Sequence, residues 1–151
     1  MASSAFELND LEQAKRAVPD EYFPREDEPY MNERQMRFFR ALLEEWKRSI
    51  RDSATATLQN LQDGPIREAD ANDRASSEAD WGLELRTRDR QRKLTAKIDA
   101  ALRRIDEGDY GYCEQTGDPI GIKRLLARPV ATLTVEAQEA HERREKISRD
   151  D

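Results

Sequence analysis

The residues with the clearest chemistry in this chain are carboxylates gathered between residues 63 and 80, in the stretch DGPIREADANDRASSEAD. The acidic side chains that we single out are Glu68, Asp70, Asp73, Glu78 and Asp80. Carboxylates this close together can bind basic side chains or a magnesium ion, and an Asp beside a turn can also cap a helix. Both interpretations, contact with a partner and helix capping, are open from the residues alone.

Cysteine and histidine occur once each, as Cys113 and His141. A nucleophilic or redox-active cysteine needs a neighbouring base or a second thiol, and neither is visible in the sequence. We therefore interpret Cys113 as a half-buried residue without a reaction of its own. His141 falls in a highly charged stretch, which predicts a solvated surface position. A single cysteine also excludes internal disulfides and fits a reducing compartment.

The acidic stretch separates two helical patterns of nearly equal length. The first opens at Asn32, which can act as an N-cap with Gln35 in capping-box position, and its apolar residues recur at spacings of three and four. Gly64 and Pro65 end it, because proline lacks an N–H and disfavours helix in the residue before it. Two helices joined by a short loop run antiparallel, so we predict a helical hairpin about 45 Å long with an acidic tip. The weaker second pattern consists of Leu83, Thr87, Leu94, Ile98, Leu102 and Ile105.

Composition favours long solvated helices over a conventional globule, because charged residues make up 38% of the chain and hydrophobic residues only 36%. No signal peptide or membrane span is visible, so we expect a soluble, cytoplasmic protein without a membrane partner.

The net charge of −6 argues against free DNA or RNA as the main partner, since binding to them requires neutralisation of phosphates. Basic residues gather between Arg86 and Arg104, on the second helix. An acidic tip and a basic flank indicate a protein or nucleotide partner with complementary patches.

The expected fold is mainly α: a long antiparallel coiled-coil hairpin that projects from a small globular module and is followed by a C-terminal helix. Residues 1–32 form an N-terminal segment that packs on the module, and residues 33–108 form the hairpin, with its tip at 63–80. Residues 109–133 form the turn-rich module, and residues 134–151 the last helix. An intramolecular coiled coil favours a monomer.

Four stretches of the chain carry a family resemblance. YGYCEQTGDPIGIKRLLARP, residues 110–129, resembles the zinc-finger signature of the DksA/TraR family. YMNERQMRFFRALLEEW, residues 30–46, and LELRTRDRQRKL, residues 83–94, are similar to the two arms of that family's coiled coil. DANDRA, residues 70–75, matches the family's tip pattern Asp-x-x-Asp-x-Ala. Because the four matches are ordered, fit in their intervals and span most of the chain after residue 29, the chain is identified as a member of this family.

The resemblance also locates the family's zinc positions, two CxxC pairs that in this chain read Cys113, Thr116, Thr134 and Ala137. Structural zinc needs four nitrogen or sulfur ligands in a tetrahedron, and one thiol, two hydroxyls and a methyl group cannot supply them. We therefore expect no zinc and no other cofactor. The module would be a degenerate, zinc-finger-like unit held by packing, similar to cysteine-poor members of the family.

The resemblance implies a transcription regulator that is not an enzyme. Members of the family bind RNA polymerase at the β′ rim and secondary channel, do not bind promoter DNA directly, and insert the coiled-coil tip towards the active site, which destabilises open complexes. Asp70, Asp73 and Ala75 would be the tip residues of this chain. Arg90 corresponds to an arginine that the family uses in polymerase binding.

The family also implies an effector, guanosine tetraphosphate (ppGpp), the alarmone of the stringent response, which is bound jointly with the polymerase. Its contacts correspond to Leu94, Lys97 and Arg128, and lysine and arginine suit phosphates. A third basic position of the family reads Gln138 here. The loss of that charge weakens the expected coupling to ppGpp.

Three other function classes remain open at this point. A Gre-like transcript-cleavage or elongation factor would use the tip carboxylates on a molecule of similar shape. A nucleic-acid-binding hairpin would use the basic arm. A structural coiled-coil adaptor would fit the composition alone.

Overall fold

The computed structural model describes residues 5–18, 22–62 and 71–150, with side chains described outside residues 5–9, 57–62, 71–77 and 149–150. The described part is helical apart from turns, and its one β-type pairing is an isolated bridge between Tyr112 and Pro119. The helices are α1 (Ala5–Ala17), α2 (Glu33–Gln62), α3 (Ala71–Glu107), α4 (Ile122–Ala127) and α5 (Val135–Asp150).

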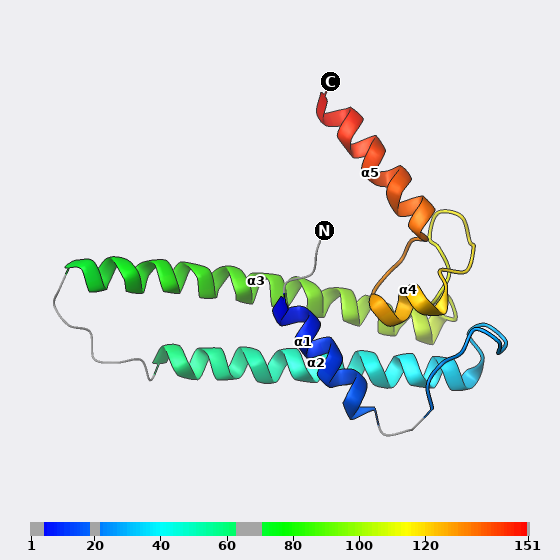
Figure 1. Ribbon diagram of the computed structural model, residues 1–151, viewed down its shortest axis with the longest axis horizontal. Helices are drawn as coiled ribbons and strands as arrows, with labels where there is room; N and C mark the ends of the chain where they lie inside the picture. Colours follow the sequence, from blue (N-terminus) through cyan, green and yellow to red (C-terminus); the bar gives the residue numbers. More distant parts are fainter. Residues whose placement is uncertain (1–4, 19–21, 63–70, 151) are drawn as a thin grey trace.

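Helices α2 and α3 form the predicted antiparallel hairpin, which dominates the molecule in Figure 1. Two ion pairs join the helices in this register: Lys47 Nζ lies 2.6 Å from Asp99 Oδ1, and about two turns nearer the module Arg40 pairs with Asp106. At 1.5 Å per residue, the 37 residues of α3 span about 55 Å. The mainly α fold predicted from the sequence, a long hairpin with a small module at one end, is confirmed.

The core of the hairpin lies at its base, the end next to the module. The buried hydrophobic residues of α2 and α3 are Phe38, Phe39, Leu42, Leu43, Trp46, Ile50, Ile98, Ala101 and Ile105. They follow the spacing of three and four that the sequence pattern predicts for one face of a helix. Phe38 and Phe39 extend this core sideways through edge-to-face ring contacts, Phe38 with Tyr22 and Phe39, and Phe39 in a tilted contact with Tyr110.

The start of α2 is set by its cap. The Asn32 side chain accepts a hydrogen bond from the Gln35 backbone N–H (2.9 Å), which satisfies one of the free donors of the first turn. The Gln35 side chain in turn accepts from the Met31 N–H (2.7 Å) and is fully buried. The capping pair expected at Asn32 and Gln35 therefore forms, with the reaching side chain one residue further back than the standard capping box has it.

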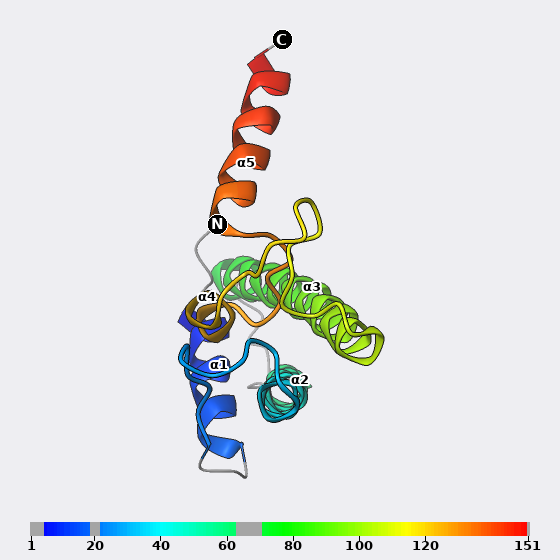
Figure 2. The same ribbon diagram turned by 90° about the vertical axis from the view of Figure 1, so that its right-hand side faces the viewer.

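Helix α1 runs crosswise over one flank of the hairpin, as Figures 1 and 2 show from two directions. It packs on α2 through Leu11 and Ala14, which are buried, and through Asp10, which accepts hydrogen bonds from Ser49 (2.9 Å) and Ser53 (3.2 Å). The sequence interpretation assigned this whole N-terminal segment to the module. The structure divides it, with α1 on the hairpin and the later residues near the module.

Helix α5 extends away from the hairpin in both views (Figures 1 and 2). Thr134 caps it, because its hydroxyl oxygen accepts the Ala137 N–H at 3.2 Å. No helix within the described ranges is long and apolar enough to cross a membrane.

Candidate functional site

Three of the four positions that the family uses for zinc, Cys113, Thr116 and Thr134, come together in the module. A tight turn closes where the Gly117 N–H donates to the Cys113 carbonyl (2.9 Å) and the Cys113 N–H donates to the Asp118 carbonyl (2.8 Å). The Thr134 hydroxyl lies 4.0 Å from Cys113 Sγ, and Thr134 also caps the turn that carries Ala137. The side chains of Thr116 and Thr134 therefore lie around one sulfur atom in this turn.

The sulfur atom at the centre of this cluster has an acidic thiol. Burial raises the pKa of the Cys113 thiol, but a hydrogen bond from the Thr116 hydroxyl and backbone N–H bonds from Thr134, Thr116 and Gln115 outweigh burial and lower the pKa to about 6. Cys113 itself is only 4% exposed. The sequence interpretation of Cys113 as an ordinary half-buried residue missed this environment, because the donors come from residues that the fold alone brings together.

A set of buried and partly buried hydrogen bonds joins the module to the start of the hairpin. The Tyr110 hydroxyl donates to the Pro129 carbonyl (2.8 Å), and burial raises the pKa of Tyr110 far above its usual value. The Tyr30 hydroxyl donates to the Gly111 carbonyl (2.6 Å) and accepts the Gly121 N–H (3.0 Å). These bonds tie three separate stretches of chain into one unit, so the module has a fixed position relative to the hairpin.

Gly111 is needed for this close approach. Its φ of +91° lies in the left-handed region, and a Cβ there would come within 2.9 Å of the Met31 side chain. The guanidinium of Arg104 on α3 donates hydrogen bonds to two backbone carbonyls of the same turn, those of Asp109 (3.1 Å) and Tyr112 (2.8 Å).

The tip predicted at residues 63–80 is placed only in part. Asp70 lies outside the described residues, and for Asp73 and Ala75 the backbone alone is described. Both belong to the first turns of α3, which begins at Ala71, inside the stretch 63–80 that we assigned to the tip. They lie at the end of the hairpin remote from the module, and their role in a tip contact stays a prediction.

The other predicted binding residues are divided between α3 and the module. Arg90 and Lys97 are exposed on α3, and Leu94 lies between them, half-buried, on the same face at helical spacing. Arg128 ends α4, where its N–H donates to the Arg124 carbonyl (2.7 Å) and its side chain is exposed. Neither Lys97 nor Arg128 forms an ion pair with a residue that the structure describes.

Gln138, which replaces a basic residue of the family, is engaged locally on α5. Its side-chain amide donates to Glu142 (3.1 Å) one turn further along the helix. His141 pairs with Glu145 on the same helix at 3.0 Å, with its side chain 45% exposed, as expected of a surface histidine.

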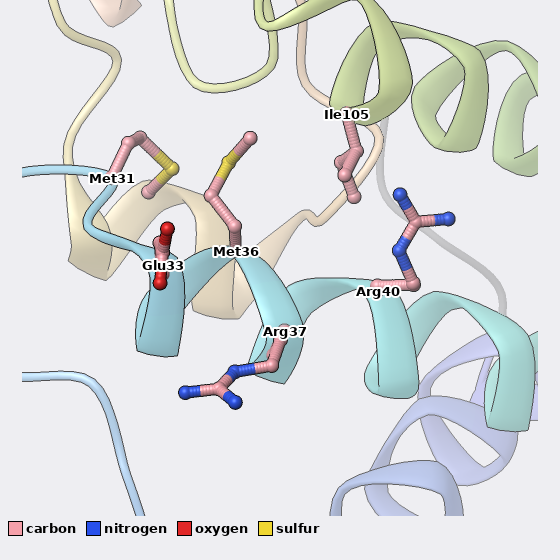
Figure 3. A pocket seen from close by; sticks show the side chains of 6 residues that line it. All are labelled: Met31, Glu33, Met36, Arg37, Arg40 and Ile105. Atoms are coloured by element: carbon pink, nitrogen blue, oxygen red, sulfur yellow. The ribbon is translucent and has the colours of Figure 1, made fainter.

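A shallow depression of about 410 Å³ lies at the base of the hairpin (Figure 3). Met36 and Arg40 rise from α2 towards α3, from which Ile105 points back, while Arg37 points away. Because Arg40 is already paired with Asp106, the depression offers mainly thioether and aliphatic surface. It brings together no nucleophile with a base, so it has the character of a packing defect rather than a reaction site.

A second groove lies on the arm beyond the core and was missed by the sequence interpretation. Leu83 was assigned to the seam between the helices, yet this residue is 57% exposed. Leu85, two residues further on, is 53% exposed. Gln91, a polar residue about two turns further along α3, is buried. The sequence did not show which face of this part of α3 turns inward, because its apolar spacing is too weak to determine that face.

A long antiparallel hairpin with a small module of zinc-finger type at its base defines a class of helical hairpin proteins. Comparisons with known proteins place the chain in the same class. The family model of the DksA N-terminal domain (DnaK suppressor protein DksA) matches residues 35–105, and that of the prokaryotic dksA/traR C4-type zinc finger matches residues 108–143. The chain belongs to the DksA/TraR family.

Relatives resemble the chain over most of its length. The RNA polymerase-binding transcription factor DksA of Caulobacter vibrioides (strain NA1000 / CB15N) is 59% identical over 87% of this chain and 92% of the relative. The protein of the same name from Escherichia coli (strain K12) is 44% identical over 83% of each chain. The solved structure of transcription factor DksA2 from Pseudomonas aeruginosa superposes with a TM-score of 0.70 at 44% identity, covering 78% of this chain and 90% of that one.

The match to a C4-type zinc finger contradicts our prediction that the chain takes no zinc, because that family model points to zinc binding. The prediction counted donor side chains and did not consider that Thr116 and Thr134 gather around Cys113. The donors present are still one thiol and the hydroxyls of Thr116 and Thr134, with a methyl group at Ala137. No group of three or more His, Cys, Asp or Glu side chains suited to a metal occurs among the described residues. The side chains at the four positions therefore do not by themselves complete the tetrahedral set that the family model implies.

Proposed function

We propose that this chain is a transcription regulator that binds RNA polymerase directly at the β′ rim and secondary channel and inserts the hairpin tip towards the active site. Its effect would be to destabilise open complexes, by binding rather than by catalysis and without direct contact to promoter DNA. Membership of the DksA/TraR family supports this proposal, as do relatives named RNA polymerase-binding transcription factor. We further expect a cytoplasmic monomer.

The observation that carries the proposal is the separation of the two ends of the hairpin. The module and the hydrophobic core lie at one end, and Asp73 and Ala75 begin α3 at the other. About 50 Å of helix therefore lies between the docking module and the tip. A narrow rod of this length can reach deep into a channel while the module stays outside, and a carboxylate at its end can meet basic side chains or a catalytic magnesium ion.

We infer that ppGpp acts jointly with the polymerase through Leu94, Lys97 and Arg128. Both cations are exposed and free of described ion pairs, so they can bind phosphates without breaking an existing contact. The neutral Gln138, held by Glu142, leaves this site one charge poorer than the family pattern. The expected response to ppGpp is therefore present but weaker than three cations would give.

The test is single-round transcription from a ribosomal RNA promoter with purified polymerase, comparing the wild type with Asp73→Asn, each with and without ppGpp. The matched control is Asp52→Asn, which makes the same chemical change at an exposed position of α2 outside the tip. We expect the wild type and Asp52→Asn to inhibit transcription, and Asp73→Asn to lose inhibition while still binding polymerase. An increase with ppGpp, reduced in Lys97→Ala, would support the effector site.

Equal inhibition by Asp73→Asn and the wild type would reduce Asp73 to a helix cap. Inhibition accompanied by cleavage of backtracked RNA would favour the Gre-like alternative. Failure of the wild type to bind polymerase would overturn the proposal as a whole.

A further inference from the structure

Met31, the residue just before the cap of α2, has an unusual backbone conformation. Its φ is +54°, and no other described residue apart from glycine has a positive φ. The left-handed region is costly for a residue with a side chain, so this conformation persists only where neighbouring contacts hold it. The Met31 N–H donates to the buried Gln35 side chain (2.7 Å), which provides one of these contacts.

The Met31 thioether provides another contact, against the module. A Cβ added to Gly111 would lie 2.9 Å from both Cγ and Sδ of Met31, so the sulfur atom packs on the bare backbone of this glycine. Tyr30 joins the same place, since its hydroxyl donates to the Gly111 carbonyl and accepts the Gly121 N–H. Met31 therefore supports the joint between hairpin and module through its sulfur and through the backbone next to Tyr30.

The Met31 side chain also borders an open hollow. It is half-buried and lines the depression at the base of the hairpin together with Met36 (Figure 3). The depression, of about 410 Å³, admits molecules the size of water. Hydrogen peroxide is little larger than water, so this thioether is accessible to peroxides in a way that a methionine enclosed in a core is not.

We propose that Met31 is a site of reversible oxidation by peroxides and that its oxidation loosens the joint between hairpin and module. A sulfur lone pair attacks one oxygen of hydrogen peroxide, and the S–O bond forms as the O–O bond breaks. The other oxygen takes up the proton of the first and leaves as water, so the sulfur loses two electrons and the peroxide gains them. A methionine sulfoxide reductase reverses the step, with the oxygen leaving as water and two thiols joined as a disulfide.

The place beside Gly111 suits a thioether and does not suit a sulfoxide. The added oxygen is a polar acceptor, and the nearest backbone donors of the module, the N–H groups of Ile120 and Gly121, already have partners. The sulfoxide would therefore turn into the hollow, where water is available, and leave Gly111. The backbone of Met31 then loses a contact that holds its left-handed conformation, and its relaxation draws the Tyr30 hydroxyl away from the module. This inference does not depend on binding to polymerase.

Met36 supplies the matched comparison. Its side chain lines the same depression and carries the same thioether, but it lies within α2 and points towards α3 (Figure 3). It is half-buried, as Met31 is. Oxidation of Met36 should therefore leave the contacts of Tyr30 with the module intact.

The test treats the full-length wild type, Met36→Leu and Met31→Leu with hydrogen peroxide, with added free methionine as the reference for reactivity. Mass spectrometry of peptides locates the sulfoxide, and hydrogen exchange follows the Gly121 amide, which Tyr30 holds. We expect Met31 to be oxidised in the wild type and Met36→Leu, and the Gly121 amide then to exchange at least about tenfold faster. In Met31→Leu the same treatment should change that exchange rate by less than about twofold.

Recovery separates Met31 from Cys113. Dithiothreitol with a methionine sulfoxide reductase should restore slow exchange of Gly121, whereas dithiothreitol alone, which reduces a sulfenic acid but not a sulfoxide, should not. Recovery with dithiothreitol alone would assign the response to Cys113 and overturn the proposal. A Met31 that stays unoxidised while free methionine is consumed, or an oxidised Met31 with unchanged exchange of Gly121, would also overturn it. These outcomes are measured on the wild type, so they hold even if Met31→Leu does not fold.

Discussion

The base and the distal arm of one hairpin differ sharply in what their side chains do. At the base, Phe39, Leu42 and Leu43 are completely buried, and Ile98 closes on them from α3. In the distal arm, leucines of the same chemistry stand in solvent, Leu83 and Leu85 among them. The two regions belong to the same pair of helices, so the difference lies in whether a second surface covers their apolar side chains.

The contacts that stabilise the hairpin are therefore concentrated at its base, and the part that extends away from the module has few of them. Helix α1, the module and the aromatic residues around Phe38 all gather at the base, where they enclose the seam. Toward the tip, no third helix covers the described parts of α2 and α3 (Figure 1). Regions with few buried contacts open at lower free energy, so the arm can adapt to a partner without unfolding the base.

The largest effect that separates the two regions should come from truncating an apolar side chain in each. Phe39→Ala is expected to lower the free energy of unfolding by about 3–5 kcal/mol, because it leaves a cavity in a fully enclosed core. Leu85→Ala, at 53% exposure, is expected to change it by less than about 0.5 kcal/mol. Urea unfolding followed by circular dichroism measures both. Similar losses for the two variants would break the comparison, because they would show that the distal arm is packed in solution.

Much of the base could be predicted from the sequence, because its determinants are local. Asn32 and Gln35 predict the start of α2 at the base, and their capping contact forms. The distal arm could not be predicted as well. Its acidic composition suggested a loop, whereas α3 already begins at Ala71, since Asp and Ser are tolerated in a first turn.

The site residues divide in the same way. The convergence of Thr116 and Thr134 on Cys113 followed from the family positions, but the acidity of the thiol did not, because it depends on backbone donors that only the folded turn provides. The short helix α4 was hidden in a stretch rich in turn residues. The exposure of Leu83 was missed because residue spacing gives the period of a helix and leaves its rotation undetermined when the apolar pattern is weak.

A second difference between the two regions should appear in the pH dependence of stability, measured on chelator-treated protein. The pKa of Cys113 is lowered to about 6 in the folded state, below its ordinary value in an unfolded chain. Between these two values the unfolded state binds more protons, so stability rises from pH 6 to pH 9 and is lost as pH falls through 6. The slope from one group is at most about 1.4 kcal/mol per pH unit.

The measurement compares urea midpoints of the wild type and Cys113→Ser at several pH values. The wild type should gain stability relative to the variant between pH 6 and pH 9, and Arg92→Ala in the distal arm should follow the wild-type profile. Parallel curves for the wild type and Cys113→Ser would mean that the hydrogen bonds to the sulfur do not favour the thiolate. The pH sensitivity would then not belong to the base.

The smallest predicted effect concerns Gln91, where the enclosed seam gives way to the distal arm. Its side chain is 5% exposed, and neither the amide nitrogen nor the oxygen has a hydrogen-bond partner among the described residues. A buried amide without a partner costs about 1–3 kcal/mol, so Gln91→Leu is expected to raise the free energy of unfolding by about 1 kcal/mol.

Gln138→Leu, at a half-buried position on α5, is the control and should give no gain. A gain at Gln91 alone would show that the chain keeps a weak point where the base ends, which allows the arm to move as a unit. A loss would show that the amide is hydrated or paired in solution, and the seam would then continue further toward the tip than the exposed leucines indicate.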